Sequence, residues 1–148
     1  MMNLTEFVTE SNRIEGIHRA CPHEVEALEA FLNSKASMSD LIKLVGEFEP
    51  DAELRNKFGM NVRVGKYKPP LGGPHIIEKL QNILQDVKHK DPFLTHLKYE
   101  ALHPFTDCNG RSGRALWLWQ MLKLNRKISA GGFLHTFYYQ TLSELDPP

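Results

Sequence analysis

The segment from His103 to Arg114 gathers side chains that suit the handling of a phosphate group. His103 can accept a proton from a hydroxyl group near neutral pH. Asp107 supplies a hard oxygen ligand, which suits a magnesium ion shared with a polyphosphate. Asn109 and Gly110 tolerate left-handed backbone dihedrals, so they can turn several N–H groups toward one point. The segment therefore predicts a site for a phosphate-bearing ligand at the start of a helix.

Two arginines follow this turn at a helical spacing. Arg111 and Arg114 stand three residues apart, so both can project from the same side of a helix. Guanidinium groups bind phosphate oxygens in a bidentate manner, and the N-terminus of a helix adds a partial positive charge. The apolar run from Ala115 to Leu124 predicts that this helix lies in the core.

Each of these residues also has an ordinary structural explanation. A histidine before a proline commonly ends a helix, and arginines after a turn commonly face solvent. Their joint occurrence ahead of a buried helix is harder to explain as surface, while Phe105 is interpreted as an apolar anchor for the loop. A metal shared by His96 and His103, seven residues apart, is a weaker alternative because no Cys/His spacing of a structural zinc site appears.

The same segment resembles the signature of the Fic (filamentation induced by cAMP) family, H-P-F-x-[D/E]-G-N-G-R-x-x-R. It departs from that signature at Cys108, where glycine is usual. The resemblance covers roughly residues 40–140. Within them, the stretch from Gly65 to Pro70 looks like the target-binding flap of the family and the turn after it. The helix through His96 and Tyr99 looks like the one that leads into the signature.

This resemblance implies a protein adenylyltransferase that transfers AMP from ATP to a Ser, Thr or Tyr hydroxyl of a target protein. His103 would be the general base, and Asp107 would hold Mg²⁺ on the α- and β-phosphates. The hydroxyl would attack the α-phosphorus in line, and pyrophosphate would leave. Asn109 and the backbone around Gly110 would cradle the α-phosphate, while the two arginines would bind the β- and γ-phosphates. The implied nucleotide-binding residues are Asn109, Gly110, Arg111, Gly113 and Arg114.

Cys108 leaves alternatives open. A side chain at this position strains the turn if the residue needs a positive φ. Relatives with alanine here include the kinase-like Doc toxin, but Doc-like members also replace the second glycine with lysine, and this chain keeps Gly110. Gly110 therefore favours nucleotide transfer over phosphate transfer. The alternatives are a catalytically quiet Fic-like binding or regulatory module, and a Fic enzyme that transfers a different phosphate-containing group.

A second motif lies near the N-terminus, in the string from Ser11 to Gly16. Ser11 and Glu15 are four residues apart, so they share a helix face, as an exposed pair on an amphipathic helix also would. The string resembles the Fic inhibitory motif, [S/T]-x-x-x-E-[G/N], of the autoinhibited class with an N-terminal inhibitory helix. That resemblance implies that Glu15 pairs with Arg114, repels the polyphosphate and leaves ATP in an unproductive pose.

Residues 59–74 lack helix signals and alternate in polarity before a glycine- and proline-rich stretch. The pattern predicts a short strand pair or flap. In the family that the chain resembles, a target segment pairs with the edge of this flap by β-augmentation. A plain hairpin covering the core is the alternative. The flap residues singled out by the resemblance are Val64, Gly65, Lys66 and Tyr67.

Helices must position these motifs, and their spacing predicts a mainly α fold. The expected architecture is a Fic-type helical bundle with a short β-hairpin flap near the active site, in a single domain over residues 1–148. Ser37 or Ser39 should cap the third helix, with Leu41, Ile42, Leu44 and Val45 buried. The expected helices are an inhibitory helix within residues 1–20, reaching Ile17, and helices over 22–32, 37–48, 76–87, 91–103, 115–124 and 133–142.

Composition places limits on the function. A chain of 148 residues with 41% hydrophobic and 24% charged residues is typical of one ordinary domain. The formal net charge of +0 argues against a protein that mainly coats nucleic acid. Cys21 and Cys108 provide no disulfide framework, which favours a reducing, cytoplasmic location. The absence of a signal-peptide pattern and of a long apolar stretch argues against a membrane role, and a homo-oligomer is possible.

Overall fold

The computed structural model describes residues 3–126, and this range is mainly helical, as the sequence predicts. The helix expected over 133–142 lies outside the described residues. No helix between residues 3 and 126 is long and apolar enough to cross a lipid bilayer. In chain order the elements are α1 (Leu4–Ile14), α2 (Pro22–Leu32), α3 (Met38–Phe48), α4 (Pro74–Leu84), the 3₁₀ turn η1 (Val87–His89), α5 (Pro92–Leu102) and α6 (Asn109–Lys123).

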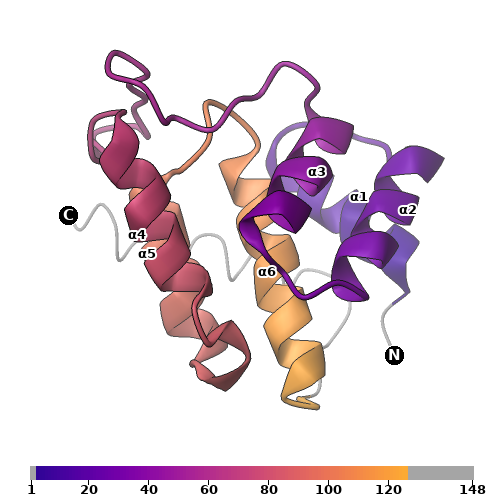
Figure 1. Cartoon of the computed structure of the whole chain (residues 1–148). Helices are drawn as coiled ribbons and strands as arrows, with labels where there is room; N and C mark the ends of the chain where they lie inside the picture. Colours follow the sequence, from indigo (N-terminus) through magenta and orange to yellow (C-terminus); the bar gives the residue numbers. More distant parts are fainter. Residues whose placement is uncertain (1–2, 127–148) are drawn as a thin grey trace.

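Helix α6 is the central element of the fold (Figure 1). It contacts α1, α2 and α3 on one side and α5 on the other, and α4 packs against α5. Its residues are buried without a break from Arg111 to Gln120, so the prediction of a core helix is confirmed. Because the start of α6 is buried along with its middle, the polar residues at that start are enclosed by the surrounding helices.

Capping residues begin α3 and α5 where the sequence predicts. Ser37 Oγ accepts a hydrogen bond from the Asp40 N–H, and the Asp40 carboxylate accepts one from the Ser37 N–H. This reciprocal pair is a capping box. At α5 the Asp91 carboxylate accepts from the Leu94 N–H at 3.0 Å, and Pro92 occupies the first turn.

Expectations about one helix face and several helix ends are wrong, and α6 starts at Asn109, six residues before the expected start at Ala115. Ile42 is 44% exposed, although its neighbours on α3 are buried. Helix α3 lies at the surface and turns only one stripe toward the core, so adjacent apolar residues cannot all be covered. Helix α4 starts two residues early, at Pro74, and ends at Leu84, since Asp86 adopts a left-handed conformation with φ of 53° that interrupts the helix.

Helix α1 ends three residues before its apolar periodicity predicts. Gly16 has a φ of 78°, and its N–H donates to the Arg13 carbonyl at 2.9 Å. The Ile17 N–H donates to the Asn12 carbonyl at 3.0 Å. These two bonds form a Schellman motif, which closes the helix. Glu15 is thereby the C-cap residue of α1, and the backbone holds it in place.

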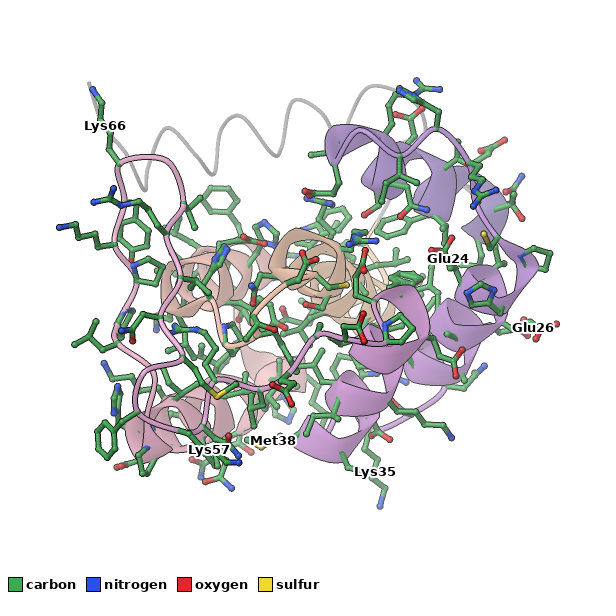
Figure 2. The ribbon with its side chains drawn as sticks, turned by 90° about the horizontal axis from the view of Figure 1, so that it is seen from above. Glu24, Glu26, Lys35, Met38, Lys57 and Lys66 are labelled. Carbon is green, nitrogen blue, oxygen red and sulfur yellow. The ribbon has the colours of Figure 1, made fainter. Side chains whose placement is uncertain are left out.

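Residues 59–73 form a loop, where residues 59–74 were expected to form a flap, and the structure has less β character here than the sequence predicts. Between residues 3 and 126 there are two isolated bridges and no strand. One bridge joins Val64 and Tyr67 through backbone hydrogen bonds of 3.0 and 2.9 Å. The prolines at 69–70 have no N–H with which to extend this ladder. The result is a tight turn, with Lys66 at its outer tip pointing away from the helices (Figure 2).

Arg55 ties this loop to the segment that follows α5. Its side chain is fully buried. The guanidinium donates to the carbonyl oxygens of Leu102 and His103 at 2.9 and 2.6 Å. It also donates to those of Met60 and Pro70 at 3.0 and 2.9 Å. Four carbonyls from two distant stretches of chain therefore depend on one side chain.

We expect Arg55→Ala to lower the free energy of unfolding by about 3 kcal/mol or more, because four carbonyls would lose their donor and a large side chain would leave the interior. Urea unfolding followed by circular dichroism measures this. Arg63→Ala is the matched control, since Arg63 is exposed on the same loop. Its expected change is within about 0.5 kcal/mol. Equal losses for the two variants would contradict a special role for Arg55.

Candidate active site

The loop between α5 and α6 is closed by hydrogen bonds from its own side chains. It is bounded by two left-handed residues, His103 with a φ of 50° and Cys108 with a φ of 69°. The Asn109 amide accepts from the Phe105 N–H at 2.9 Å and donates to the Phe105 carbonyl at 2.8 Å. Phe105 is buried, in agreement with its interpretation as an anchor. The Asn109 side chain therefore holds the loop, leaving its backbone N–H for a ligand.

His103 is arranged as a proton acceptor. Its Nδ1 lies 2.8 Å from the Glu100 carbonyl oxygen. A carbonyl can only accept, so Nδ1 carries the proton and Nε2 keeps its lone pair. Burial lowers the pKa of His103 below its usual value, and the nearby Arg55 charge lowers it as well. The ring is thus neutral and basic at Nε2 near neutral pH.

The start of α6 offers donors to an anion. In the first turn, Asn109, Gly110 and Arg111 have backbone N–H groups with no partner inside the helix. Arg111 is 4% exposed and donates from Nη2 to Glu49 at 2.8 Å. Its Nε is buried and has no hydrogen-bond acceptor within the described part of the chain. A buried donor without an acceptor is costly, so an anion bound here would satisfy it.

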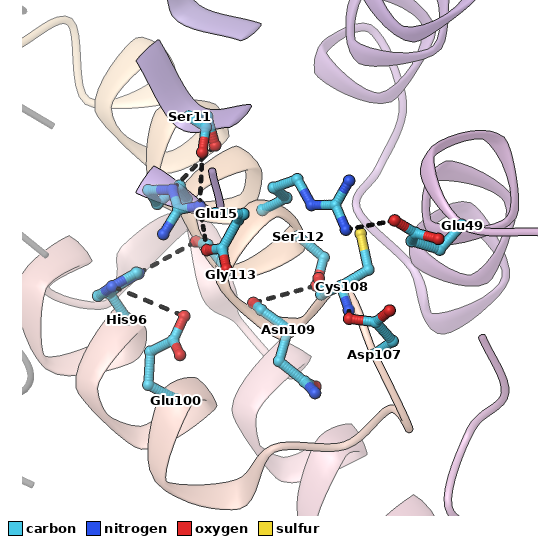
Figure 3. Close-up of polar contacts among 12 residues, drawn as sticks. Ser11, Glu15, Glu49, His96, Glu100, Asp107, Cys108, Asn109, Ser112 and Gly113 are labelled. Atoms are coloured by element: carbon cyan, nitrogen blue, oxygen red, sulfur yellow. Dashed lines mark hydrogen bonds and ion pairs between the residues drawn. The ribbon is translucent and has the colours of Figure 1, made fainter. Parts of the chain in front are cut away.

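Arg114 joins α6 to α1 (Figure 3). Its Nε donates to Ser11 Oγ at 2.8 Å, and its Nη2 donates to the Ser11 carbonyl at 3.0 Å and to Glu15 Oε1 at 2.9 Å. The Arg114 side chain is 1% exposed and that of Glu15 is 33% exposed. The contact between Glu15 and Arg114 that the resemblance implies is therefore present.

Gly110 makes this contact possible. A Cβ atom at that position would lie 2.6 Å from Glu15 Oε1 and 2.9 Å from Arg114 Nη1. Those separations are too short for non-bonded atoms, so any other residue would push the ion pair apart. The glycine therefore serves the close approach of α1. It lies in the first turn of α6 and has no positive φ, so the left-handed turn expected at Asn109 and Gly110 is made by Cys108 instead.

A pocket of about 240 Å³ lies at the start of α6. It brings together most of the side chains that the sequence singles out, and Val64 of the loop contributes to its wall. Glu15 lines the same pocket, so a negative charge faces the donors of α6. The residues of the segment 103–114 that line it are His103, Thr106, Asp107, Cys108, Asn109, Gly110 and Arg111.

Three of the predicted site residues have other contacts. Gly113 faces α5, where an added Cβ would lie 2.6 Å from Glu100 Oε1, so it serves helix packing. Tyr67 donates its hydroxyl to the Ala101 carbonyl at 2.8 Å, which pins the turn to α5. Lys66 is exposed at the outer tip of that turn.

Asp107 suits a magnesium ion held jointly with a phosphate ligand. It is exposed, and its Oδ1 accepts the Cys108 N–H at 2.7 Å. Magnesium commonly binds one or two carboxylates and completes its shell with phosphate oxygens and water. Between residues 3 and 126, no group of three His, Cys, Asp or Glu side chains could hold a metal ion. A metal ion at His96 and His103 would therefore have no third ligand of these types there.

Cys108 has the positive φ that the sequence analysis identified as a source of strain. The thiol is buried, and burial raises its pKa to about 12. Such a thiol stays protonated at neutral pH, so it is a poor nucleophile. Cys108 and Cys21 are both free.

Three residues near the site, Arg55, Glu49 and Glu100, were not identified from the sequence, and His96 was considered only as a metal ligand and as part of the preceding helix. Arg55 lies in a polar stretch with no motif around it. Glu49 and Arg111 are far apart in sequence, and only the fold brings them together. His96 and Glu100 form a buried pair on α5, with His96 Nε2 3.9 Å from Glu100 Oε1. Their spacing of four residues within an apolar helix was the available signal.

A scan against protein-family models gives no match for this chain, and a search of the curated proteins gives none either. The site geometry and the sequence motifs are therefore the basis for assigning a function.

The buried pair predicts a bell-shaped dependence of stability on pH. Burial lowers the pKa of His96 to about 3, so its contribution to stability is complete above pH 6.5 and is lost as the pH falls. Burial raises the pKa of Glu100 to about 8, so its contribution is complete below pH 4.5 and is lost as the pH rises toward 8. The two effects cancel between pH 4.5 and 6.5, where this pair gives maximal stability.

Urea unfolding at pH 5.5 and at pH 8 measures this dependence. The free energy of unfolding should be lower at pH 8, and Glu100→Gln should remove most of that decline. Glu78→Gln is the control, since Glu78 is exposed on α4. An identical decline in Glu100→Gln and the unmodified protein would contradict the assignment to Glu100.

Proposed function

We propose that this chain is a Fic-type protein adenylyltransferase held inactive by Glu15. The observation that carries the proposal is a single pocket that combines a histidine with a bare Nε2, the first-turn N–H groups of α6, Asp107 and Glu15. These groups can position a hydroxyl, the phosphates of ATP and a magnesium ion within one site.

His103 supports the chemical step. Its Nε2 would accept the proton of a target hydroxyl as the oxygen attacks the α-phosphorus, and pyrophosphate would leave. The N–H groups of Asn109, Gly110 and Arg111 would hold the α-phosphate oxygens, on which negative charge increases. Arg111 and Arg114 would bind the outer phosphates. Asp107 would hold Mg²⁺, which neutralises phosphate charge when bound.

Glu15 supports the inhibition. It occupies the guanidinium of Arg114, which the terminal phosphate of ATP would need, and it places a carboxylate in the same pocket. A polyphosphate entering the pocket would meet a like charge and would lack one of its two arginines. Displacement of Glu15 is therefore the step that would activate the protein.

The loop with Val64 at the pocket wall supports a role in target binding. Gly65 is left-handed, and Tyr67 anchors the turn on α5. A target segment that added to this edge as a strand would complete a β-hairpin flap and would bring a Ser, Thr or Tyr hydroxyl over His103. We place the reaction in the cytoplasm, with a protein target and no nucleic acid or membrane partner.

A catalytically quiet Fic-like module is the second candidate. Two observations favour it, the three hydrogen bonds that hold Arg114 on α1 and the side chain of Cys108 in the phosphate loop. Such a module would keep the fold and bind a partner without group transfer. A Fic enzyme that transfers another phosphate-containing group is a variant of the first proposal.

Incubation with ATP labelled at the α-phosphate, with magnesium, tests the proposal. Glu15→Gly should raise label transfer to the protein itself or to added lysate proteins by about tenfold or more, because the competing charge is removed. His103→Ala in that background should lower transfer by a factor of about 10² to 10⁴. Glu10→Gln is the control on α1, because Glu10 pairs with Arg13.

The outcomes separate the candidates. Absence of label in Glu15→Gly with intact ATP binding would contradict the proposal and favour the quiet module. A parallel incubation with ATP labelled at the γ-phosphate that gives label, when the α-labelled ATP gives none, would indicate a kinase. The mass added to the modified protein identifies the transferred group.

A further inference from the structure

Glu100 is a buried acidic residue that the proposed reaction does not use. It lies on α5, lines the pocket and is 7% exposed. Its Oε1 has no hydrogen-bond partner within residues 3–126. His96 Nε2 lies 3.9 Å from Glu100 Oε1, too far for a hydrogen bond. That ring donates from Nδ1 to the Gly113 carbonyl and is neutral, so its Nε2 bears no proton for Glu100.

Three ionisable side chains from three helices act on one another at this point. Arg114 of α6 and Glu15 of α1 both act electrostatically on the Glu100 carboxyl of α5. Gly113 permits this approach, since an added Cβ would lie 2.6 Å from Glu100 Oε1. Figure 3 shows Glu100 below Gly113, on the same side of the site as Glu15. Glu15 accepts from the Arg114 guanidinium in this structure, while the Glu100 carboxyl lies within its electrostatic influence.

We propose that Glu100 is a positioning residue for Arg114. When Glu15 leaves the Arg114 guanidinium, the Glu100 carboxylate takes its place. In the inhibited state Glu15 holds Arg114 and Glu100 stays neutral. In the released state the Glu100 carboxylate accepts from Arg114 and keeps the guanidinium at the pocket. The remaining N–H donors of Arg114 then face the terminal phosphate. This inference rests on the proposed function and adds an exchange of partners to it.

The requirement that buried charges be paired supports this exchange. Arg114 is 1% exposed, so departure of Glu15 would remove a carboxylate from the surroundings of a buried cation. Burial raises the pKa of Glu100, Arg114 lowers it, and Glu15 raises it. Loss of Glu15 removes the like charge, so Glu100 can release its proton to solvent and pair with Arg114. His96 and Tyr99, the other titratable groups that face Glu100, are buried and neutral.

A double-mutant cycle in urea unfolding at pH 7.5 tests the exchange without nucleotide. The variants are Glu15→Gln, Glu100→Gln and the double variant, with Glu78→Gln on α4 as control. Alone, Glu100→Gln should raise stability, because it removes a carboxyl that takes up a proton on folding. In the Glu15→Gln background it should lower stability, because Arg114 then has neither carboxylate. The coupling should be about tenfold in the unfolding equilibrium constant.

Calorimetry with MgATP and MgADP tests the role in positioning. In the Glu15→Gln background, added Glu100→Gln should weaken MgATP binding by about tenfold and leave MgADP nearly unchanged, since Arg114 would act on the terminal phosphate of ATP. Glu100→Asp should restore part of the lost affinity, because it keeps the charge.

The outcomes are distinguishable. Equal stabilisation by Glu100→Gln in both backgrounds would overturn the exchange. If the unfolding experiments show the coupling but no variant binds nucleotide, the exchange is supported and the proposed nucleotide site is contradicted. Equal loss of MgATP and MgADP affinity would overturn the positioning role.

Discussion

The buried guanidinium of Arg55 is the constraint on which the site depends. A cation taken out of water needs oxygen atoms around it, and here they are backbone carbonyls from the end of α5 and from the loop after α3. Neither segment can shift alone without leaving a polar group unsatisfied. The left-handed backbone of His103, and with it the ring at the pocket, is therefore set by a residue 48 positions earlier in the chain.

A second buried arginine connects stability with regulation. Arg114 secures α1 to the central helix through Ser11 and Glu15, so the contact that blocks the proposed phosphate site also contributes to the docking of α1. The Schellman motif at Gly16 fixes where Glu15 stands, and the small size of Gly110 admits it. The left-handed backbone of Gly16 and the missing side chain of Gly110 thus allow this carboxylate to reach its arginine.

The sequence predicted the parts of the molecule that depend on local pattern. The core burial of α6, the cap at Ser37 and the end of α5 at His103 follow from periodicity and capping chemistry. Prediction from the sequence failed where tertiary contacts determine the structure. Ile42 is exposed because α3 has only one covered face, and Arg55 looked like an ordinary polar residue because its carbonyl partners lie far away in sequence. Asn109 was expected to face phosphate, whereas its amide closes the loop on Phe105.

The contact between Glu15 and Arg114 joins residues 99 positions apart in one chain, and this has a consequence for how it competes with a ligand. A tethered group acts at a fixed effective concentration, commonly in the millimolar range or above for a short connection. Dilution of the protein does not weaken it, and a free anion must exceed that local concentration to displace it. The response to a ligand is therefore set by the stability of one helix on the core, independently of how much protein is present.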